Sequence, residues 1–469
     1  MKDMSLAPMT RRQVLAVAGA TGIGVGVIRL LGGSLQQVGS QKASGSGWVS
    51  PLNSEGARVM QLLRRTTFGY TPAQLEAALS DGFDKTVDRL IETRPAEPTV
   101  PSFATSPGGR FAVNQLQSWW VDHLLATPTP FAERMTLFWH GHFTSDYRKV
   151  ANETYIYWQN LTWRRMALTD LRSMLMQVTT DPAMLRYLDL ATSTGQNPNE
   201  NYSRELMELF TMGAGNYTED DVRESAKALA GWVEPPADSG AGRQAVYSTQ
   251  KTGVFIPRRA YRGNVTYLGK TGALDAQGVI DRILAQPAMA TFITSKLVAH
   301  FVTGRPSQSY VNGLAETFRR SKYDMKAVMR TILTSAEFSS DASYRSLIKS
   351  PAEFMVHAAR ALGLEAGGNI SKLIGASGSG MGQSLFDPPD VNGWPNNDSW
   401  ISSNTVVERV NFVTAALSQV KGSLPSANDA VHAQLDGVVS KQTSTFLAQA
   451  TDDRARWFIT LASPEFQLK

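Results

Sequence analysis

The stretch Thr218-Glu219-Asp220-Asp221, ahead of an apolar-periodic run from Val222 to Trp232, has the form of a helix capping box. Similar start signals are found at Asn152, at Asp181-Pro182 and at Thr71-Pro72. Because these starts follow one another closely, the sequence predicts a mainly α protein with one large helical domain. Apolar residues also recur with the helical period over residues 275–285, 288–301, 311–319, 325–335 and 350–362.

Strand patterns are scarce. Only two segments, Ala245 to Ile256 and Val265 to Leu268, alternate between apolar and polar residues well enough to be strands. We expect them to form a small β-hairpin inserted between helices. The chain has no fixed-period repeat and no Walker or dinucleotide-binding fingerprint, so no nucleotide cofactor is expected.

The composition limits the possible classes of protein. With 469 residues, 42% hydrophobic and 19% charged, the chain can bury a full hydrophobic core. The formal net charge is +5, of which +3 lies in the first 30 residues, leaving 5 − 3 = +2 for the rest. A body so close to neutral lacks the basic surface of a nucleic-acid binder. With 0 cysteines, disulfides, thiolate metal sites and Cys nucleophiles are excluded.

The N-terminus carries an export pattern. Arg11-Arg12 precedes Leu15 and a Gly/Ala-rich apolar run from Ala16 to Ile28, which is typical of a twin-arginine signal. We therefore expect residues 1–31 to be an export signal recognised by the twin-arginine export machinery, residues 32–51 a flexible Gly/Ser/Gln-rich segment, and residues 52–469 the helical domain. The protein would be periplasmic or extracellular. The alternatives are a Sec signal, a short membrane anchor, or retention at the membrane by an uncleaved signal.

The segment from Phe138 to Phe143 holds two of the 6 histidines, His140 and His142, between aromatic residues. Gly141 suggests that a helix ends here, which would let both imidazoles converge on one divalent metal ion. The alternative is a helix terminus at which the histidines bond the last carbonyls between packed aromatic rings.

An acidic amphipathic helix is predicted from Asn199 to Phe210. Asn201, Glu205 and Glu208 share one face and could supply metal ligands or an acid/base pair. The alternative is a solvated face with an Arg204–Glu208 ion pair.

A proline-rich loop runs from Phe386 to Asn396 and carries Asp387, Asp390, Asn392 and Trp394. Prolines would fix the two carboxylates and the amide towards a ligand, on which Trp394 could stack. The alternative is ordinary turn and capping chemistry, with Trp394 in the core.

Taken in order, several motifs resemble the bacterial family called domain of unknown function 1800, from about Val59 to beyond Phe412. The resemblance implies a bacterial, commonly exported protein whose genes often neighbour sulfatase-like proteins, and it implies no established activity. It draws attention to the three segments just described. The motifs are residues 62–69, 138–143, 181–185, 199–210, 228–232 and 386–395.

Two functions are therefore expected. The first is a cell-envelope metal-dependent hydrolase in which His140 and His142 bind the metal ion and Glu205 or Glu208 completes the shell or acts as general base. The second is a non-enzymatic binding or assembly factor for a secreted polymer or a sulfatase-like partner protein. The sequence leaves the metal ion and the substrate open.

Overall fold

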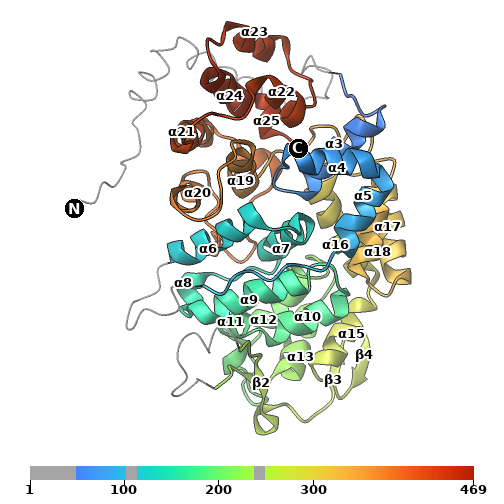
Figure 1. Cartoon of the computed structure of the whole chain (residues 1–469). Coiled ribbons are helices and arrows are strands. Elements are labelled where there is room, and N and C mark those ends of the chain that lie inside the picture. Colours follow the sequence, from blue (N-terminus) through green and yellow to red (C-terminus); the bar gives the residue numbers. More distant parts are fainter. Residues whose placement is uncertain (1–48, 102–112, 237–248) are drawn as a thin grey trace, which may run out of the picture. The chain divides into compact units, whose positions relative to one another are not determined.

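A computed structural model of the chain describes residues 49–101, 113–236 and 249–469 (Figure 1). The predicted export signal and most of the predicted flexible segment lie outside these residues. The mainly α fold is confirmed, because helices make up most of the described chain and the strands are few and short. None of the described helices combines the length and apolar character that a membrane span requires.

The described residues divide into two compact units, each built from segments that are distant in the sequence. Unit 1 consists of the described residues up to Phe83 together with residues 339–383 and 395–469. Unit 2 consists of the described parts of residues 84–338 together with residues 384–394. The prediction of a single domain over residues 52–469 stays a prediction.

Unit 2 holds the histidine segment, the acidic helix and residues 386–394 of the proline-rich loop. Its helices include α7 and α9, which lie side by side (Figure 1), and four tryptophans, Trp120, Trp139, Trp158 and Trp163, are buried in its core. Burial of each Trp side chain stabilises the folded state by on the order of 4 to 6 kcal/mol through the hydrophobic effect, before the entropy cost of ordering the side chain is subtracted. The helices of unit 2 are α5 (Phe83–Glu92), which starts at the last residue of unit 1, α6 (Val113–Ala126), α7 (Pro130–His142), α8 (Tyr147–Val150), α9 (Glu153–Arg165), α10 (Leu171–Thr180), α11 (Pro182–Tyr187), η3 (Leu190–Thr192), α12 (Asn201–Glu208), α13 (Glu219–Leu229), η4 (Pro257–Arg259), α15 (Ala276–Leu284), α16 (Pro287–Phe301), α17 (Gln308–Arg320) and α18 (Met325–Leu333).

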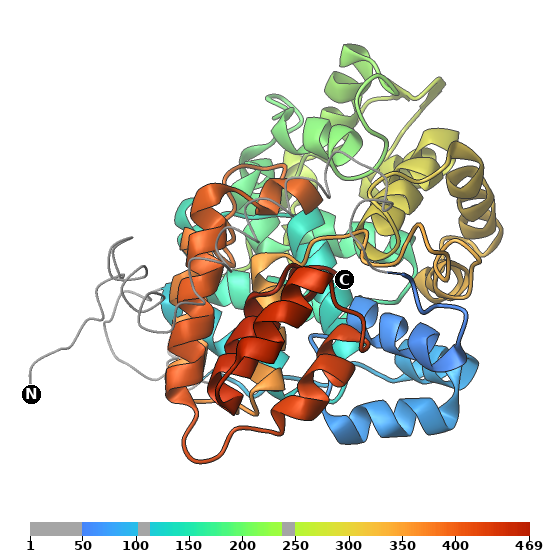
Figure 2. The same cartoon turned by 90° about the horizontal axis from the view of Figure 1, so that it is seen from above.

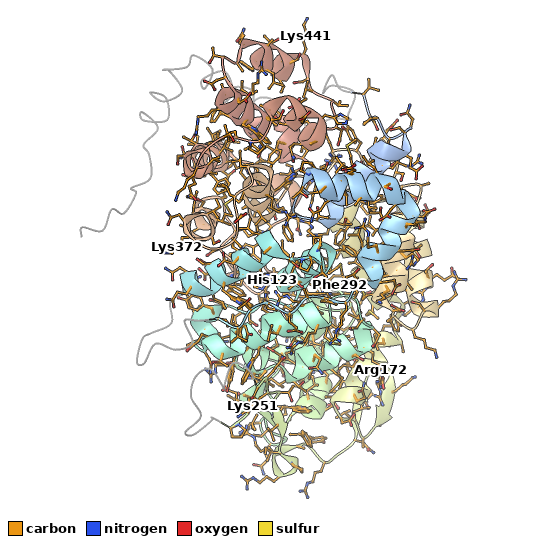
Figure 3. The ribbon with its side chains drawn as sticks, viewed as in Figure 1. His123, Arg172, Lys251, Phe292, Lys372 and Lys441 are labelled. Atoms are coloured by element: carbon orange, nitrogen blue, oxygen red, sulfur yellow. The ribbon has the colours of Figure 1, made fainter. Side chains whose placement is uncertain are left out.

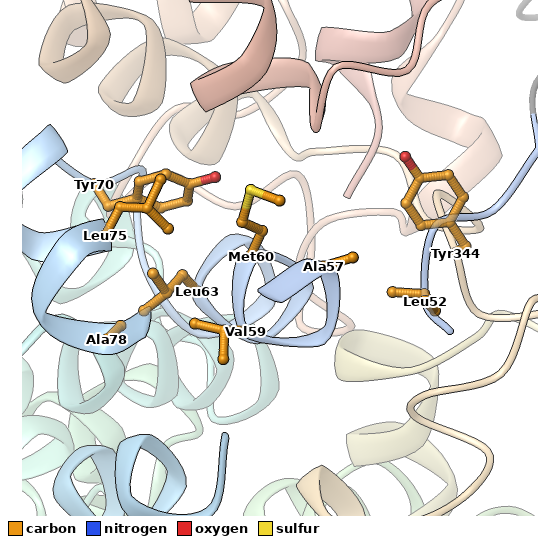
Figure 4. Close-up of a cluster of buried hydrophobic side chains, with 9 residues drawn as sticks. All are labelled: Leu52, Ala57, Val59, Met60, Leu63, Tyr70, Leu75, Ala78 and Tyr344. Atoms are coloured by element: carbon orange, nitrogen blue, oxygen red, sulfur yellow. The ribbon is translucent and has the colours of Figure 1, made fainter. Parts of the chain in front are cut away.

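Unit 1 is also helical. Figure 2 shows its orange and red helices, of which α24 packs against α21, α22 and α23. In another part of its core, apolar residues of α3 and α4 meet Tyr70 and Tyr344 (Figure 4). The helices of unit 1 are α3 (Glu55–Thr66), α4 (Pro72–Asp81), α19 (Pro351–Ala361), α20 (Asn369–Gly380), η5 (Asn397–Trp400), α21 (Ser403–Gln419), α22 (Ala427–Leu435), α23 (Lys441–Gln449), α24 (Asp453–Ala462) and α25 (Pro464–Gln467).

The predicted helix starts are confirmed by their caps. The side chain of Thr218 accepts a hydrogen bond from the Asp221 N–H at the start of α13, and the Asp221 side chain accepts one from the Thr218 N–H. Asp181 caps α11, and Asn152 caps α9. Each cap satisfies an N–H group that has no partner within the first turn of its helix.

The strands form two small antiparallel pairs. β1 (Trp232–Val233) pairs with β2 (Val254–Phe255), and β3 (Val265–Tyr267) pairs with β4 (Lys270–Gly272). The predicted small β-hairpin insertion is confirmed by β3 and β4. The two predicted segments do not pair with each other, and residues 245–248 of the first lie outside the described residues. The β3–β4 turn consists of Leu268 and Gly269, which both have positive φ, at 46° and 76°. Two-residue hairpin turns prefer this geometry, but a leucine in the turn hides the usual Asn-Gly signal.

Candidate functional site

The two histidines lie in the last turn of α7. The helix continues through Gly141 and ends at His142, and the Phe143 N–H donates to the Trp139 carbonyl over 2.7 Å. Since residues two apart on a helix point to nearly opposite sides, the imidazoles of His140 and His142 have different surroundings.

His140 is enclosed by aromatic rings and is 2% exposed. Its ring centroid lies 5.0 Å from those of Trp120, Phe386 and Trp394. The Phe386 N–H donates to Nε2 over 3.1 Å. Burial lowers the pKa of His140 to about 3. The imidazole is therefore neutral at ordinary pH, with Nε2 as acceptor and the proton on Nδ1.

His142 faces the end of the acidic helix and α16. Its Nε2 lies 2.9 Å from the Phe210 carbonyl oxygen, and its Nδ1 lies 3.2 Å from Nζ of Lys296. Burial, and next the charge of Lys296, hold the pKa of His142 well below its usual value. The carbonyl can only accept and the ammonium can only donate, so Nε2 carries the proton and Nδ1 accepts. Burial also lowers the pKa of Lys296 to about 8.

The ring nitrogens in this arrangement do not fit a shared divalent ion. On both imidazoles the acceptor nitrogen is already bonded, to the Phe386 N–H in one case and to Lys296 in the other. In the parts of the chain that the structure describes, no three His, Asp or Glu side chains are grouped so that they could hold a metal ion. The structure therefore does not bring His140 and His142 together on one ion.

The proline-rich loop packs against the C-terminal end of α7. Gly393 has a φ of 82°, and a Cβ atom there would lie 2.3 Å from the Gly141 carbonyl oxygen, so only glycine fits. The Thr144 hydroxyl donates to the Val391 carbonyl over 2.6 Å, and the Tyr147 N–H donates to the Phe386 carbonyl over 3.0 Å. These contacts fix the loop against the end of α7 and against the segment from Thr144 to Tyr147 that follows it.

The four predicted residues of this loop separate into a buried and an exposed group. Trp394 is 8% exposed and packs on His140, so its ring lies in the interior. Asp390 and Asn392 are exposed, and the Asn392 N–H donates to the Asp390 carboxylate over 2.7 Å. Asp387 is half-buried, and its Oδ1 lies 2.5 Å from Nη2 of Arg148. Of the two acidic groups of the loop, Asp390 is therefore exposed, whereas Asp387 is paired with Arg148.

The predicted acidic helix is confirmed as α12, although its ion pairs differ from the expected one. Arg204 binds Glu219 through two hydrogen bonds of 2.7 and 2.8 Å, so the expected Arg204–Glu208 pair is absent. Instead, Glu208 accepts a hydrogen bond of 2.5 Å from the Tyr217 hydroxyl. Burial, and next the charge of Glu208, raise the pKa of Glu205.

Carboxylates from three elements of unit 2 act on the ring of Tyr187, a residue that the sequence did not single out. Burial raises the pKa of Tyr187 to about 12, with further contributions from the charges of Asp146, Asp390 and Glu205. Asp146 caps α8, Asp390 lies in the loop and Glu205 lies on α12. Tyr187 is 8% exposed, and its hydroxyl has no hydrogen-bond partner among the described residues. We call Tyr187 and these three carboxylates the acidic cluster.

A buried ion pair that no sequence pattern indicated supports the histidine region. Glu133 and Arg164 both have fully buried side chains, joined by hydrogen bonds of 2.5 and 3.0 Å. The indole N–H of Trp120, which packs on His140, donates to Glu133 over 2.9 Å. Burial alone would raise the pKa of Glu133, but Arg164 and His123 hold it at about 2. Figure 3 shows His123 on α6 and Phe292 on α16 among the side chains of unit 2.

Comparison with known proteins gives one match. The family described as protein of unknown function (DUF1800) matches residues 61–468, nearly the whole chain. The resemblance that the motifs indicated is thereby confirmed. No curated protein and no solved structure matches the chain.

Proposed function

The chain belongs to the DUF1800 family of proteins of unknown function, and from this premise we propose that it is an exported, non-enzymatic cell-envelope protein that binds a partner. The acidic cluster is the binding surface. The partner is an exported protein with a basic segment, which the carboxylates of Asp146, Asp390 and Glu205 attract.

The observation that carries this proposal is that carboxylates from three separate elements, all at least partly exposed, act electrostatically on the one buried tyrosine, Tyr187. Asp390 is exposed, and Asp146 and Glu205 are partly exposed. Two cations of the chain already lie here, because Arg148 is 3.5 Å from Asp146 and Nζ of Lys149 is 5.6 Å from the centroid of the Tyr187 ring, so a basic partner has to displace them. The phenol beneath them has a hydroxyl that can bond an incoming group. By contrast, the histidines are enclosed, and their acceptor nitrogens are bonded within the protein.

Site-specific photo-cross-linking in the native host tests this function. A photoreactive residue at position 390 should give one discrete adduct with another exported protein, whereas the same residue in place of Lys441, exposed on unit 1 (Figure 3), should give none. Asp146→Asn combined with Glu205→Gln should reduce the adduct at least about tenfold, since two attractive charges are lost. Equal adducts from both positions, or an adduct that is indifferent to the charge changes, would refute the proposal.

The metal-dependent hydrolase stays a second candidate, favoured by the adjacent carboxylates of Glu205 and Glu208. A carboxyl with a raised pKa can take up a proton during hydrolysis. Elemental analysis of the exported protein tests this candidate. The hydrolase candidate predicts about one metal ion per chain in the wild type and none in a folded His140→Ala/His142→Ala variant. His432→Ala, which changes an exposed histidine, is the control and should keep the metal ion. A metal-free, folded wild type with no hydrolytic activity would rule against it.

A further inference from the structure

Unit 1 buries four cationic side chains close to one another, and neither proposed function uses them. Arg64 comes from α3, Arg345 and Lys349 precede α19, and Arg409 comes from α21. Their exposed fractions are 5%, 3%, 2% and 1%, respectively. We call these four residues the basic cluster. The positive charges lie near one another, because those of Arg64, Arg345 and Arg409 all act to lower the pKa of Lys349, after burial itself.

One carboxylate, that of Asp436, balances part of this charge. Its Oδ1 accepts from Nη1 of Arg64 over 2.7 Å, and its Oδ2 lies 3.9 Å from Nη2 of Arg345. Lys349 and Arg409 bond neutral oxygens instead: Lys349 donates to the Phe466 carbonyl, and Arg409 donates to the Lys349 carbonyl.

Two other buried carboxylates of unit 1 have their own partners. Glu353 binds Nζ of Lys469 over 2.5 Å, and Glu465 accepts from the Ser440 N–H and the Thr443 hydroxyl over 2.7 and 3.0 Å. The charge of Glu465 acts on Arg345, so the four cations share the charges of two carboxylates, Asp436 and Glu465. Buried charges are normally paired, so a net positive charge at this place calls for an anion.

Unbonded donor groups mark where the anion would bind. Nε and Nη2 of Arg64 and Nε of Arg409 are buried and have no acceptor among the described residues. Asp436 occupies Nη1 of Arg64, so the Nε–Nη2 edge of that guanidinium is open. Arg164 and Arg172 use the same edge to hold Glu133 and Asp281 with two hydrogen bonds each. Such an edge matches two oxygens of one oxyanion.

We propose that the basic cluster of unit 1 is a binding site for a tetrahedral oxyanion, phosphate or sulfate, held by the Nε–Nη2 edge of Arg64 and by the charges of Lys349, Arg345 and Arg409. A doubly charged anion offsets the excess charge better than a single carboxylate does. The anion also favours the charged form of Lys349. Burial of the site means that the anion exchanges only when unit 1 opens locally.

Thermal unfolding at constant ionic strength tests this proposal. Exchange of chloride for inorganic phosphate or sulfate should raise the Tm of the wild-type protein in a saturable way, by at least about 3 °C. Acetate at the same ionic strength should have less effect. Ion chromatography of protein refolded in phosphate, then desalted and acid-denatured, should find about one phosphate per chain, as the proposed occupancy requires. A phosphate effect no larger than that of chloride, together with a phosphate-free protein, would overturn the proposal.

A charge-conserving variant locates the site. Arg64→Lys keeps the positive charge but removes the open Nε–Nη2 edge. The phosphate concentration that gives half of the maximal increase in Tm should therefore rise at least about tenfold. The matched control is Arg172→Lys, an exposed arginine of unit 2 (Figure 3) that uses the same edge for Asp281, and it should keep the wild-type phosphate response. If Arg64→Lys does not fold, Arg409→Lys takes its place. A full phosphate response in a folded variant of the basic cluster would overturn the assignment.

Discussion

In unit 2 the carboxylate of Glu133 receives N–H groups from Arg164 and Trp120, whereas in unit 1 the guanidinium of Arg64 keeps two buried N–H groups without an acceptor. Both regions are buried, and both contain arginine. They differ at the Nε–Nη2 edge of the guanidinium, because Glu133 fills this edge of Arg164 and leaves only Nη1 unbonded, whereas the same edge of Arg64 has no acceptor and four cations lie near Asp436 and Glu465. A satisfied ion pair holds the surrounding helices together, and an excess of charge calls for a ligand.

The largest expected effect comes from removing the anion of the satisfied pair. Glu133→Gln leaves Arg164 charged, buried and without its carboxylate, so the free energy of unfolding should fall by about 3 to 5 kcal/mol. Urea unfolding followed by circular dichroism measures this loss. Phosphate should not restore the stability of this variant, since the charge is missing in unit 2. A loss below about 1 kcal/mol would mean that the pair is a minor contributor.

A smaller effect is expected from the pH dependence of the enclosed histidine. The pKa of His140 is about 3 in the folded protein and roughly 6.5 in the unfolded chain. The contribution of the neutral imidazole to the free energy of unfolding is therefore complete above pH 6.5 and is lost as the pH falls towards 3. His140→Gln, which does not titrate, should reduce the difference in stability between pH 7 and pH 5 by about 2 kcal/mol. The exposed control His432→Gln should keep the wild-type difference. Urea unfolding at the two pH values measures this, and identical pH dependence in all three proteins would contradict it.

The smallest effect is expected where a cation of the basic cluster is removed. Lys349→Met eliminates a buried charge whose pKa is already held well below its usual value by burial and by neighbouring arginines. The free energy of unfolding in chloride should change by less than about 1 kcal/mol or increase. The increase in Tm caused by phosphate should become smaller. A loss of stability comparable to that of Glu133→Gln would remove the contrast between the two units.

Local features of the fold were predictable from the sequence. A capping residue acts on N–H groups two or three positions away, and so Asp181 and Thr218 marked the starts of α11 and α13. The β3–β4 pairing escaped prediction because Leu268 takes a positive φ that leucine rarely adopts.

The candidate site depended on contacts between distant residues, which a single sequence does not reveal. The N–H group that bonds His140 belongs to Phe386, 246 residues away. Arg204 had acidic neighbours near it in the sequence and beyond, and the structure places its guanidinium 2.7 Å from Glu219 and 3.5 Å from Glu200, not on Glu208. Arg64 lies in the motif of residues 62–69, but the sequence does not show that the fold would leave two of its nitrogens without an acceptor.

The composition of unit 1 from segments on both sides of unit 2 also sets the order in which the protein can fold. Arg64 bonds Asp436, which follows it by 372 residues. At ordinary rates of synthesis, roughly 20 to 75 s separate the two residues as they leave the ribosome. During that interval nearly all of unit 2 is synthesised, but the last segment of unit 1, which contains Asp436, is not yet available to α3. The first segment of unit 1 therefore waits for the last one, and a chain that ends early leaves α3 without its carboxylate partner.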